Sequence, residues 1–191
     1  MTHKTSVIQR MGSPVRAALT STKITAGALA VLASVSLSAL AGNDNRAPEV
    51  PAEIFVDSST NKVQVQALGI GFQVYTWDGT TWTGPVPDAT LFDSDGNFVA
   101  SHFAGPSWQS SSGSKVVGGV TGKITVDQTA IPWVRLVPLS KQGPGPFADV
   151  TFIQRINTAG GKAPETNGTV VGQIAKSPYT ANYIFYRAAN D

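Results

Sequence analysis

The chain has 191 residues, of which 41% are apolar and 14% are charged, and it contains no cysteine. This length suits one ordinary domain with a packed core, and the apolar content is too high for a disordered chain of such low charge. The lack of cysteine excludes a disulfide scaffold, a Cys-ligated zinc site, an iron–sulfur cluster and a cysteine nucleophile.

The N-terminal segment has the composition of a signal peptide. Basic residues without an acidic one precede an apolar run over 24–40, and small residues at Ala39 and Ala41 mark a cleavage site after Ala41. An uncleaved anchor is the alternative, but Ala and Ser dilute the run, so no stable membrane span is expected after cleavage. The expected location is secreted or periplasmic. The predicted organisation is a signal peptide at 1–41, a flexible leader at 42–52 and a single β-rich domain at 53–191.

Cleavage would also change the net charge. It removes four of the 14 basic residues and none of the 12 acidic ones, so the formal charge changes from +2 to about −2. The remaining Lys and Arg are scattered singly and form no stripe that could follow a phosphate backbone. We therefore do not expect a nucleic acid partner.

Strand patterns occupy the rest of the chain. Apolar and polar residues alternate over 62–67, a period of two that is typical of a strand. Turn signals such as Asp78-Gly79 and Asp95-Gly96 separate the later apolar segments, and helical periodicity is nearly absent. About nine short strands predict an all-β fold, a single antiparallel β-sandwich or barrel-like domain. The further predicted strands are 72–77, 90–93, 98–103, 115–120, 123–126, 133–139, 150–157 and 182–187.

Several blocks of this region, taken together, resemble a known family. In their order along the chain they are similar to the secreted bacterial and fungal family of domain of unknown function 3455, over roughly residues 50–188. The resemblance implies a secreted single domain with no established activity. The blocks include Gly71-Phe72-Gln73-Val74-Tyr75, Ala89-Thr90-Leu91-Phe92-Asp93, His102-Phe103-Ala104-Gly105-Pro106-Ser107-Trp108-Gln109, Ile131-Pro132-Trp133, Ile153-Gln154-Arg155-Ile156-Asn157-Thr158 and Pro178-Tyr179-Thr180-Ala181-Asn182-Tyr183.

The same resemblance implies a cysteine pair that this chain lacks. Relatives carry one cysteine where this chain has Trp77 and another near the position of Asn167 or Gly168. A disulfide that closes a loop of about 90 residues would contribute on the order of 4 kcal/mol in the chain-entropy model. We expect packing around Trp77 to supply part of that stability.

The only histidine after the predicted cleavage site is His102, which excludes a two-histidine metal site. Asp93, Asp95 and Ser107 lie nearby in sequence, so a hydrolase-type triad can be drawn, but no Gly-x-Ser-x-Gly elbow supports it. A structural or ligand-contacting imidazole is favoured. The run from Asp93 to Asn97 is similar to the start of a calcium loop but lacks the distant Glu, and we interpret it as a hairpin turn.

Other candidates lie farther along the chain. Gln154 interrupts an apolar strand face, so it either bonds to backbone in the core or lines a pocket. Arg155, on the opposite face, could pair with an acid or hold an anionic ligand. Tyr179 belongs to a set of aromatic residues that could stack on sugar rings or fill the core. The pair Trp108-Gln109 follows a proline turn and is expected to be exposed.

These features predict a non-catalytic binding or envelope-associated module that needs no metal and no cofactor. The expected partner is a glycan or a small envelope molecule. Two alternatives stay open: a secreted hydrolase-type enzyme that uses His102 with a nearby acid, and a structural or stress-related extracellular protein. The predicted ligand-binding residues are His102, Trp108, Gln109, Gln154, Arg155 and Tyr179.

Overall fold

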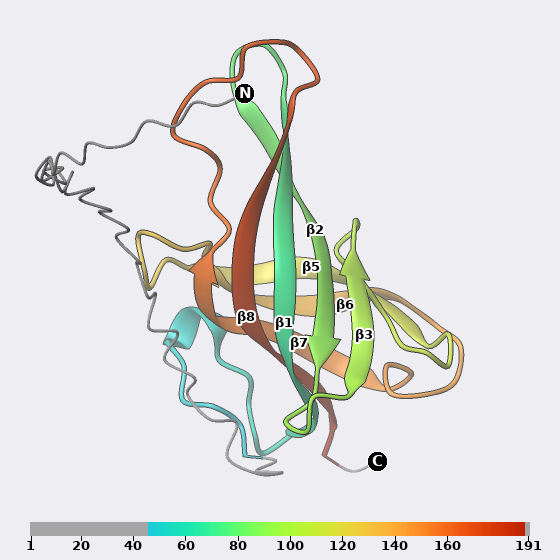
Figure 1. Cartoon of the computed structure of the whole chain (residues 1–191). Helices are drawn as coiled ribbons and strands as arrows, with labels where there is room; N and C mark the ends of the chain where they lie inside the picture. Colours follow the sequence, from blue (N-terminus) through green and yellow to red (C-terminus); the bar gives the residue numbers. More distant parts are fainter. Residues whose placement is uncertain (1–45, 190–191) are drawn as a thin grey trace, which may run out of the picture. The chain divides into compact units, whose positions relative to one another are not determined.

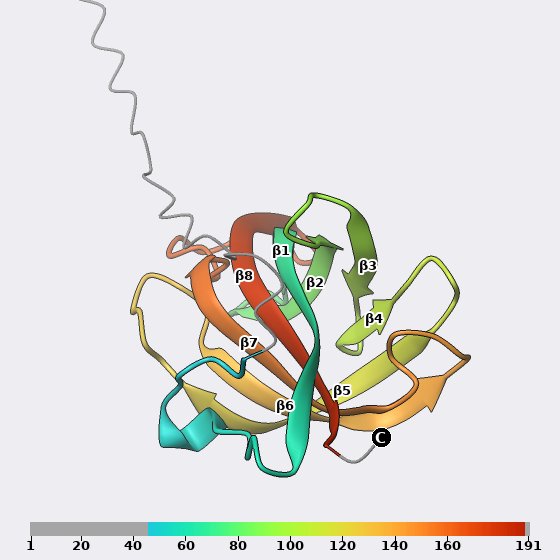
Figure 2. The same ribbon diagram turned by 90° about the horizontal axis from the view of Figure 1, so that it is seen from below.

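The computed structural model describes residues 46–189, so the predicted signal peptide lies outside the described residues. Eight antiparallel strands form one closed barrel in which each strand pairs with its sequence neighbours and β1 pairs with β8 (Figures 1 and 2). The all-β prediction is confirmed, with a barrel as its form. The strands are β1 (Asn61–Trp77), β2 (Trp82–Phe92), β3 (Phe98–Phe103), β4 (Ser107–Gln109), β5 (Lys115–Ile124), β6 (Trp133–Gln142), β7 (Val150–Gly160) and β8 (Ile174–Ala188).

Several strands are longer than their sequence patterns indicate. β1 joins two predicted segments across Gly69 and Gly71, where the apolar alternation lapses because glycine has no side chain. A Cβ at Gly69 would lie 2.6 Å from the Tyr183 ring, and one at Gly71 would collide with the backbone of β2. These glycines therefore let neighbouring strands and rings approach closely, as glycines inside strands often do.

The main core lies inside the barrel. β1 and β8 contribute inward side chains such as Ala67, Tyr183 and Phe185, while Leu91 and Ile153 face them from β2 and β7. Phe147, in the β6–β7 connection, packs against Phe185 with ring centroids 4.8 Å apart. This packing fills the interior away from the end that carries the β3–β4, β5–β6 and β7–β8 connections.

A second apolar cluster lies on the outside of the barrel wall, under an N-terminal strap that we define as residues 47–56. The strap contains the short 3-10 helix Ala52–Ile54 and buries Ile54 and Val56 against residues of β7 and β8. Ala47, within the predicted leader, packs against the same cluster. Gln154 Nε2 donates to the Ile54 carbonyl at 2.7 Å, which ties β7 to the strap.

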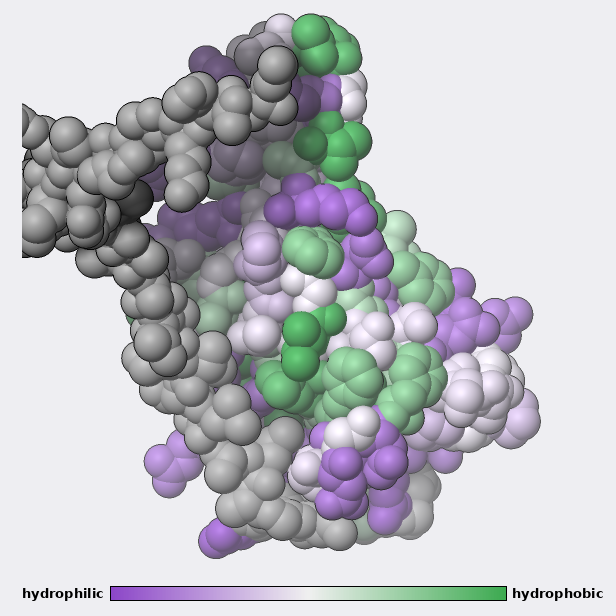
Figure 3. Space-filling model, viewed as in Figure 1, coloured by the Kyte–Doolittle hydropathy of each residue, from purple (hydrophilic) through white to green (hydrophobic). Residues whose placement is uncertain are grey.

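The outer face of β8, β1 and β2 carries exposed apolar side chains, and Figure 3 shows hydrophobic groups gathered on this face. Ile70 and Phe72 of β1 are among them, and Lys176 and Asp88 form an ion pair of 3.1 Å beside Phe72. Within the described part of the chain, no helix is long and apolar enough to cross a membrane.

Trp77, at the end of β1, occupies the place of a cysteine implied by the family resemblance. It is buried, and its ring meets Trp82 edge to face with centroids 5.4 Å apart. A Cβ built on Gly168 would lie 2.7 Å from Trp77 Cβ, so the indole packs directly on this glycine. Trp82 Nε1 donates to the Thr166 carbonyl at 2.9 Å. Trp77 and Gly168, at or near the two positions where the resemblance implies cysteines, are thus adjacent. The Trp77 side chain packs on Gly168 where relatives would have a disulfide.

Candidate functional site

One end of the barrel interior contains a cavity of about 720 Å³. Its walls come from β1, β2, β3, β5, β6 and β7, and its mouth from the β3–β4, β5–β6 and β7–β8 connections. Small-molecule sites in proteins typically have volumes of about 300–1,000 Å³. Eight-stranded barrels can be wide enough to hold one small ligand inside.

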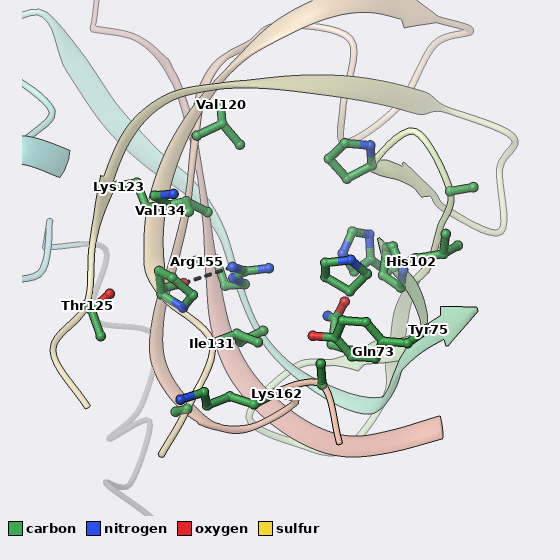
Figure 4. Close-up of a pocket in the computed structure, with 18 of the residues that line it drawn as sticks. Gln73, Tyr75, His102, Val120, Lys123, Thr125, Ile131, Val134, Arg155 and Lys162 are labelled. Atoms are coloured by element: carbon green, nitrogen blue, oxygen red, sulfur yellow. Dashed lines mark hydrogen bonds between the residues drawn. The ribbon is translucent and has the colours of Figure 1, made fainter. Parts of the chain in front are cut away.

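Arg155 is the charged side chain that reaches into this cavity from β7. Its Nη2 donates to the Pro132 carbonyl at 2.8 Å, which fixes the plane of the guanidinium. Its Nε is buried and has no hydrogen-bond partner among the described residues. Figure 4 shows Arg155 on one side of the cavity, with His102, Gln73 and Tyr75 on the other.

Gln73 and Tyr75 line the cavity from the inward face of β1. Tyr75 Oη donates its proton to the Gly161 carbonyl at 2.7 Å, so this proton is already used in a hydrogen bond within the protein. Gln73 is only 1% exposed, and its Nε2 has no partner in the part of the chain that the structure describes. A buried amide N–H without an acceptor is costly, and a bound molecule could supply that acceptor.

His102 is buried at the inner wall of the cavity and stacks on Trp108. A backbone carbonyl can only accept, so His102 Nδ1 carries the proton that it shares with the Ser107 carbonyl at 2.9 Å. Burial, opposed by the hydrogen bond to Ser107 and assisted by the nearby Arg155, lowers the pKa of His102 to about 4. The imidazole is therefore neutral at physiological pH.

The charged side chains that line the cavity are all positive. Arg155, Lys123 and Lys162 are on its lining, and no Asp or Glu is among the described residues that form it. Lys162 Nζ donates to the Gln128 carbonyl at 2.6 Å, at the mouth. Prolines, valines and Ile131 make up much of the remaining wall. The cavity thus has a largely apolar wall and three cationic side chains. It suits an anion that carries an apolar body.

The structure brings together some of the predicted ligand-binding residues and separates others. His102 and Arg155 line the cavity, and Trp108 lies behind His102 in the core. Tyr179 is buried in the same core, with its hydroxyl 3.1 Å from that of Tyr183. Gln109 is exposed.

Gln154 lies on the strap side of β7, outside the cavity. Its Nε2 bonds to the strap, and its Oε1 accepts from the Tyr186 hydroxyl at 2.6 Å. From the sequence, Gln154 could either bond to backbone in the core or line a pocket. The structure shows the first of these two roles. The expected exposure of Trp108 is wrong: the indole is 1% exposed, because the three-residue strand β4 turns it into the barrel.

The acidic turn does not reach His102. Asp93 follows β2 at the opposite end of the barrel, four residues beyond Ala89, the strand partner of His102. At about 3.4 Å per residue this places the two roughly 14 Å apart along the strand. The Asp93 carboxylate accepts bonds from the backbone N–H groups of Asp95 and Asn97, as in a hairpin turn. His102 therefore has no carboxylate partner for hydrolase chemistry within the described residues.

Sequence reasoning missed Gln73, Lys123 and Lys162 as cavity residues. A signal for Gln73 was available, because Gly71, Gln73 and Tyr75 share one strand face and an amide among them is out of place on an apolar surface. The two lysines carried no local signal, since only barrel closure brings β5 and the residues after β7 to one mouth.

The family model described as "Protein of unknown function (DUF3455)" matches residues 58–187. The chain belongs to this family. The match begins just before β1 and ends one residue before the end of β8, so it covers nearly all of the barrel and every residue of the cavity lining, and leaves out the strap. No curated protein and no solved structure matches the sequence significantly.

Proposed function

We propose that the protein binds a small organic anion inside its barrel and acts as a non-catalytic binding module. The observation that carries this proposal is the Arg155 guanidinium, which faces a cavity of about 720 Å³ with its Nε buried and unpaired. Arg155 is half-buried, and its buried Nε–H has no acceptor among the described residues; an unpaired donor of this kind is costly, and an anionic ligand would supply the missing partner.

Three further features support an anion with an apolar body. Lys123 and Lys162 at the mouth would attract a negative ligand toward the opening. Much of the wall is aliphatic, and burial of an apolar ligand surface would contribute to affinity. His102 is neutral and adds no charge of its own.

Export of the protein belongs to the same proposal. The basic and apolar composition of residues 1–41 favours a signal peptide cleaved after Ala41 and a secreted or periplasmic location. A glycan is a weaker ligand candidate, because Trp77, Trp108, Tyr179 and Tyr183 are buried in packed clusters and present no open platform. The hydrolase alternative lacks an acid beside His102 among the residues that the structure describes.

The direct test is binding of a defined panel to residues 42–191 by isothermal titration calorimetry. The panel contains octanoate, 3-phenylpropanoate, octyl phosphate, octyl sulfate and the neutral 1-octanol. We expect at least one anion to bind, and we expect Arg155→Met to weaken it about tenfold or more through loss of a charge-assisted hydrogen bond.

Lys141→Gln is the matched control, because it removes one positive charge from the exposed end of β6, away from the cavity lining. It should bind like the unmodified protein. Melting curves of both variants would establish that each is folded. If no anion in the panel binds, or if Lys141→Gln weakens binding as much as Arg155→Met, the proposal is wrong.

A further inference from the structure

Behind the large cavity lies a smaller inner chamber of about 60 Å³. His102, Val134 and Arg155 line both spaces, so the inner chamber adjoins the outer cavity across these residues. Its remaining walls include Trp108, Leu136 and Tyr183, all of which are buried core residues. The inner chamber has room for a small polar group and not for the body of a ligand.

Two N–H donors on this chamber have no acceptor within the described residues. The indole of Trp108 is almost completely enclosed, and its Nε1 has no hydrogen-bond partner in the described part of the chain. Arg155 Nε is also buried and has no hydrogen-bond partner there. An indole and a guanidinium can donate but cannot accept. Neither can satisfy the other, and although the Arg155 side chain also interacts with the Tyr183 hydroxyl, both of these N–H groups lack an acceptor among the described residues, which a bound group would supply.

The charge balance selects the kind of acceptor. One guanidinium faces the chamber, and one of its nitrogens is already bonded to the Pro132 carbonyl. A singly charged group would match it, whereas a phosphate monoester would bring a further negative charge into a site with no second cation buried beside it. The two lysines of the outer cavity, Lys123 and Lys162, are exposed residues and do not line the inner chamber.

Shape leads to the same class of ligand. A carboxylate is planar and offers two acceptor oxygens, which suits two separate donors and the geometry of an arginine side chain. The outer cavity provides the complementary surface for an aliphatic or aromatic body, with Pro87, Ile131 and Val134 on its wall.

We infer that the ligand is an amphipathic monocarboxylate that enters head first, with its carboxylate in the inner chamber between Arg155 and Trp108 and its apolar body in the outer cavity. This inference rests on the proposed function and adds the chemical class and the orientation of the ligand. The carboxylate accepts from Arg155 Nε and from Trp108 Nε1, and Gln73 Nε2 remains available to an oxygen farther along the ligand.

The test uses the indole N–H resonances of the protein. The chain has four tryptophans, so a ¹⁵N spectrum of residues 42–191 contains four indole signals, and Trp108→Phe identifies the one from Trp108. Octanoate is titrated against octyl phosphate, octyl sulfate and 1-octanol, which share its chain and differ in the head. We expect octanoate to bind about tenfold more tightly than 1-octanol and to shift the Trp108 signal downfield.

Arg155→Met should remove the preference of the protein for octanoate over 1-octanol. Trp108→Phe should keep the fold while weakening octanoate more than 1-octanol. If octanoate binds without a shift of the Trp108 indole, or if octyl phosphate or octyl sulfate binds more tightly, the head-first carboxylate is refuted while an anion-binding barrel stands. If 1-octanol binds as tightly as octanoate and the other anions, the charge of the head is irrelevant and both proposals are refuted. If neither octanoate nor the other anions bind, the proposed function fails as well.

Discussion

His102 and Trp108 form a parallel stack inside the barrel, with ring centroids 4.4 Å apart and ring planes 5° apart. Tyr183 meets both rings edge on, at centroid distances of 5.2 Å and 5.7 Å. This cluster holds the only described histidine in an environment that excludes its charged form. This side chain should therefore make its own contribution to the pH dependence of the stability of the protein.

The first prediction concerns acid stability. The folded pKa of His102 is about 4 and the unfolded value is 6.5, so between these values the unfolded chain binds more protons than the folded protein. Stability is then lost as the pH falls from about 6.5 to 4, by up to about 3 kcal/mol from this residue. Urea denaturation at pH 7.5, 6, 5 and 4 would measure the loss.

The control for this prediction is His102→Phe, which keeps an aromatic ring against Trp108 and removes the titration. Carboxylates titrate in both proteins and cancel in the comparison. The slope between pH 6.5 and 4 should be shallower in the variant; equal slopes in the two proteins would contradict the assignment.

The second prediction concerns Gln154. Replacement by Leu leaves the Ile54 carbonyl and the Tyr186 hydroxyl without their partner at the interface of strap and barrel. We expect a loss of about 2–4 kcal/mol in the free energy of unfolding, since each unsatisfied buried polar group costs about 1–3 kcal/mol. Gln109→Leu, on an exposed side chain, should be nearly neutral. A stable Gln154→Leu variant that fails to bind the organic anion would place Gln154 in the ligand site after all.

The third prediction tests how closely the strap lies on the barrel. A Cβ at Gly122 of β5 would collide with the Glu53 carbonyl, which belongs to the backbone of the strap. Gly122→Ala should therefore displace the strap and cost about 1–3 kcal/mol, the usual range for overpacking. At Gly119 of the same strand the near neighbour is the exposed and flexible Leu139 side chain. Gly119→Ala should be tolerated, and similar losses for both variants in chemical denaturation would argue against a tightly seated strap.

The fourth prediction concerns the contact of Trp77 with Gly168. Disulfides need Cβ atoms about 3.5–4.5 Å apart, so a shift of roughly 1 Å in the loop would allow a bond in the double variant Trp77→Cys, Gly168→Cys. We expect the bond to form on oxidation and to make the oxidised form about 4 kcal/mol more stable than the reduced form. Thiol titration and melting curves with and without reductant would measure this. Free thiols that persist in the folded, oxidant-treated protein would show that the two positions do not meet.

Local sequence patterns were sufficient to predict the class of the fold. The alternation over 62–67 marks the start of β1, and 98–103 coincides with β3. The segment 82–89 of β2 escaped notice because Gly84, Pro85 and Pro87 are typical of turns. Pro87 pairs with Gln73 of β1, whereas Gly84 and Pro85 fall at an irregularity in that pairing. The register with β3 begins only at Ala89, so both prolines lie where β2 has at most one neighbour and are tolerated.

The candidate site was harder to predict, because strand β7 is buried on both faces. Alternation places Gln154 and Arg155 on opposite faces, and that inference agrees with the structure. It does not reveal which face is inside, since the face of Gln154 and Ile156 is covered by a strap about 100 residues earlier in the chain. The apolar residues around Gln154 therefore suggested the barrel interior, although the interior face of β7 carries Arg155.

Closure of the barrel through β1 and β8 also determines when the chain can fold. These strands pair from Asn61 with Ala188 to Thr76 with Ile174, so the first strand gains its second neighbour only after the last strand has been synthesised. Until then β1 has an unpaired edge, and unpaired edges recruit other chains. Closure is thus delayed until β8 has been synthesised, a timing that is compatible with transport of an unfolded chain and that makes loss of β8 an aggregation hazard.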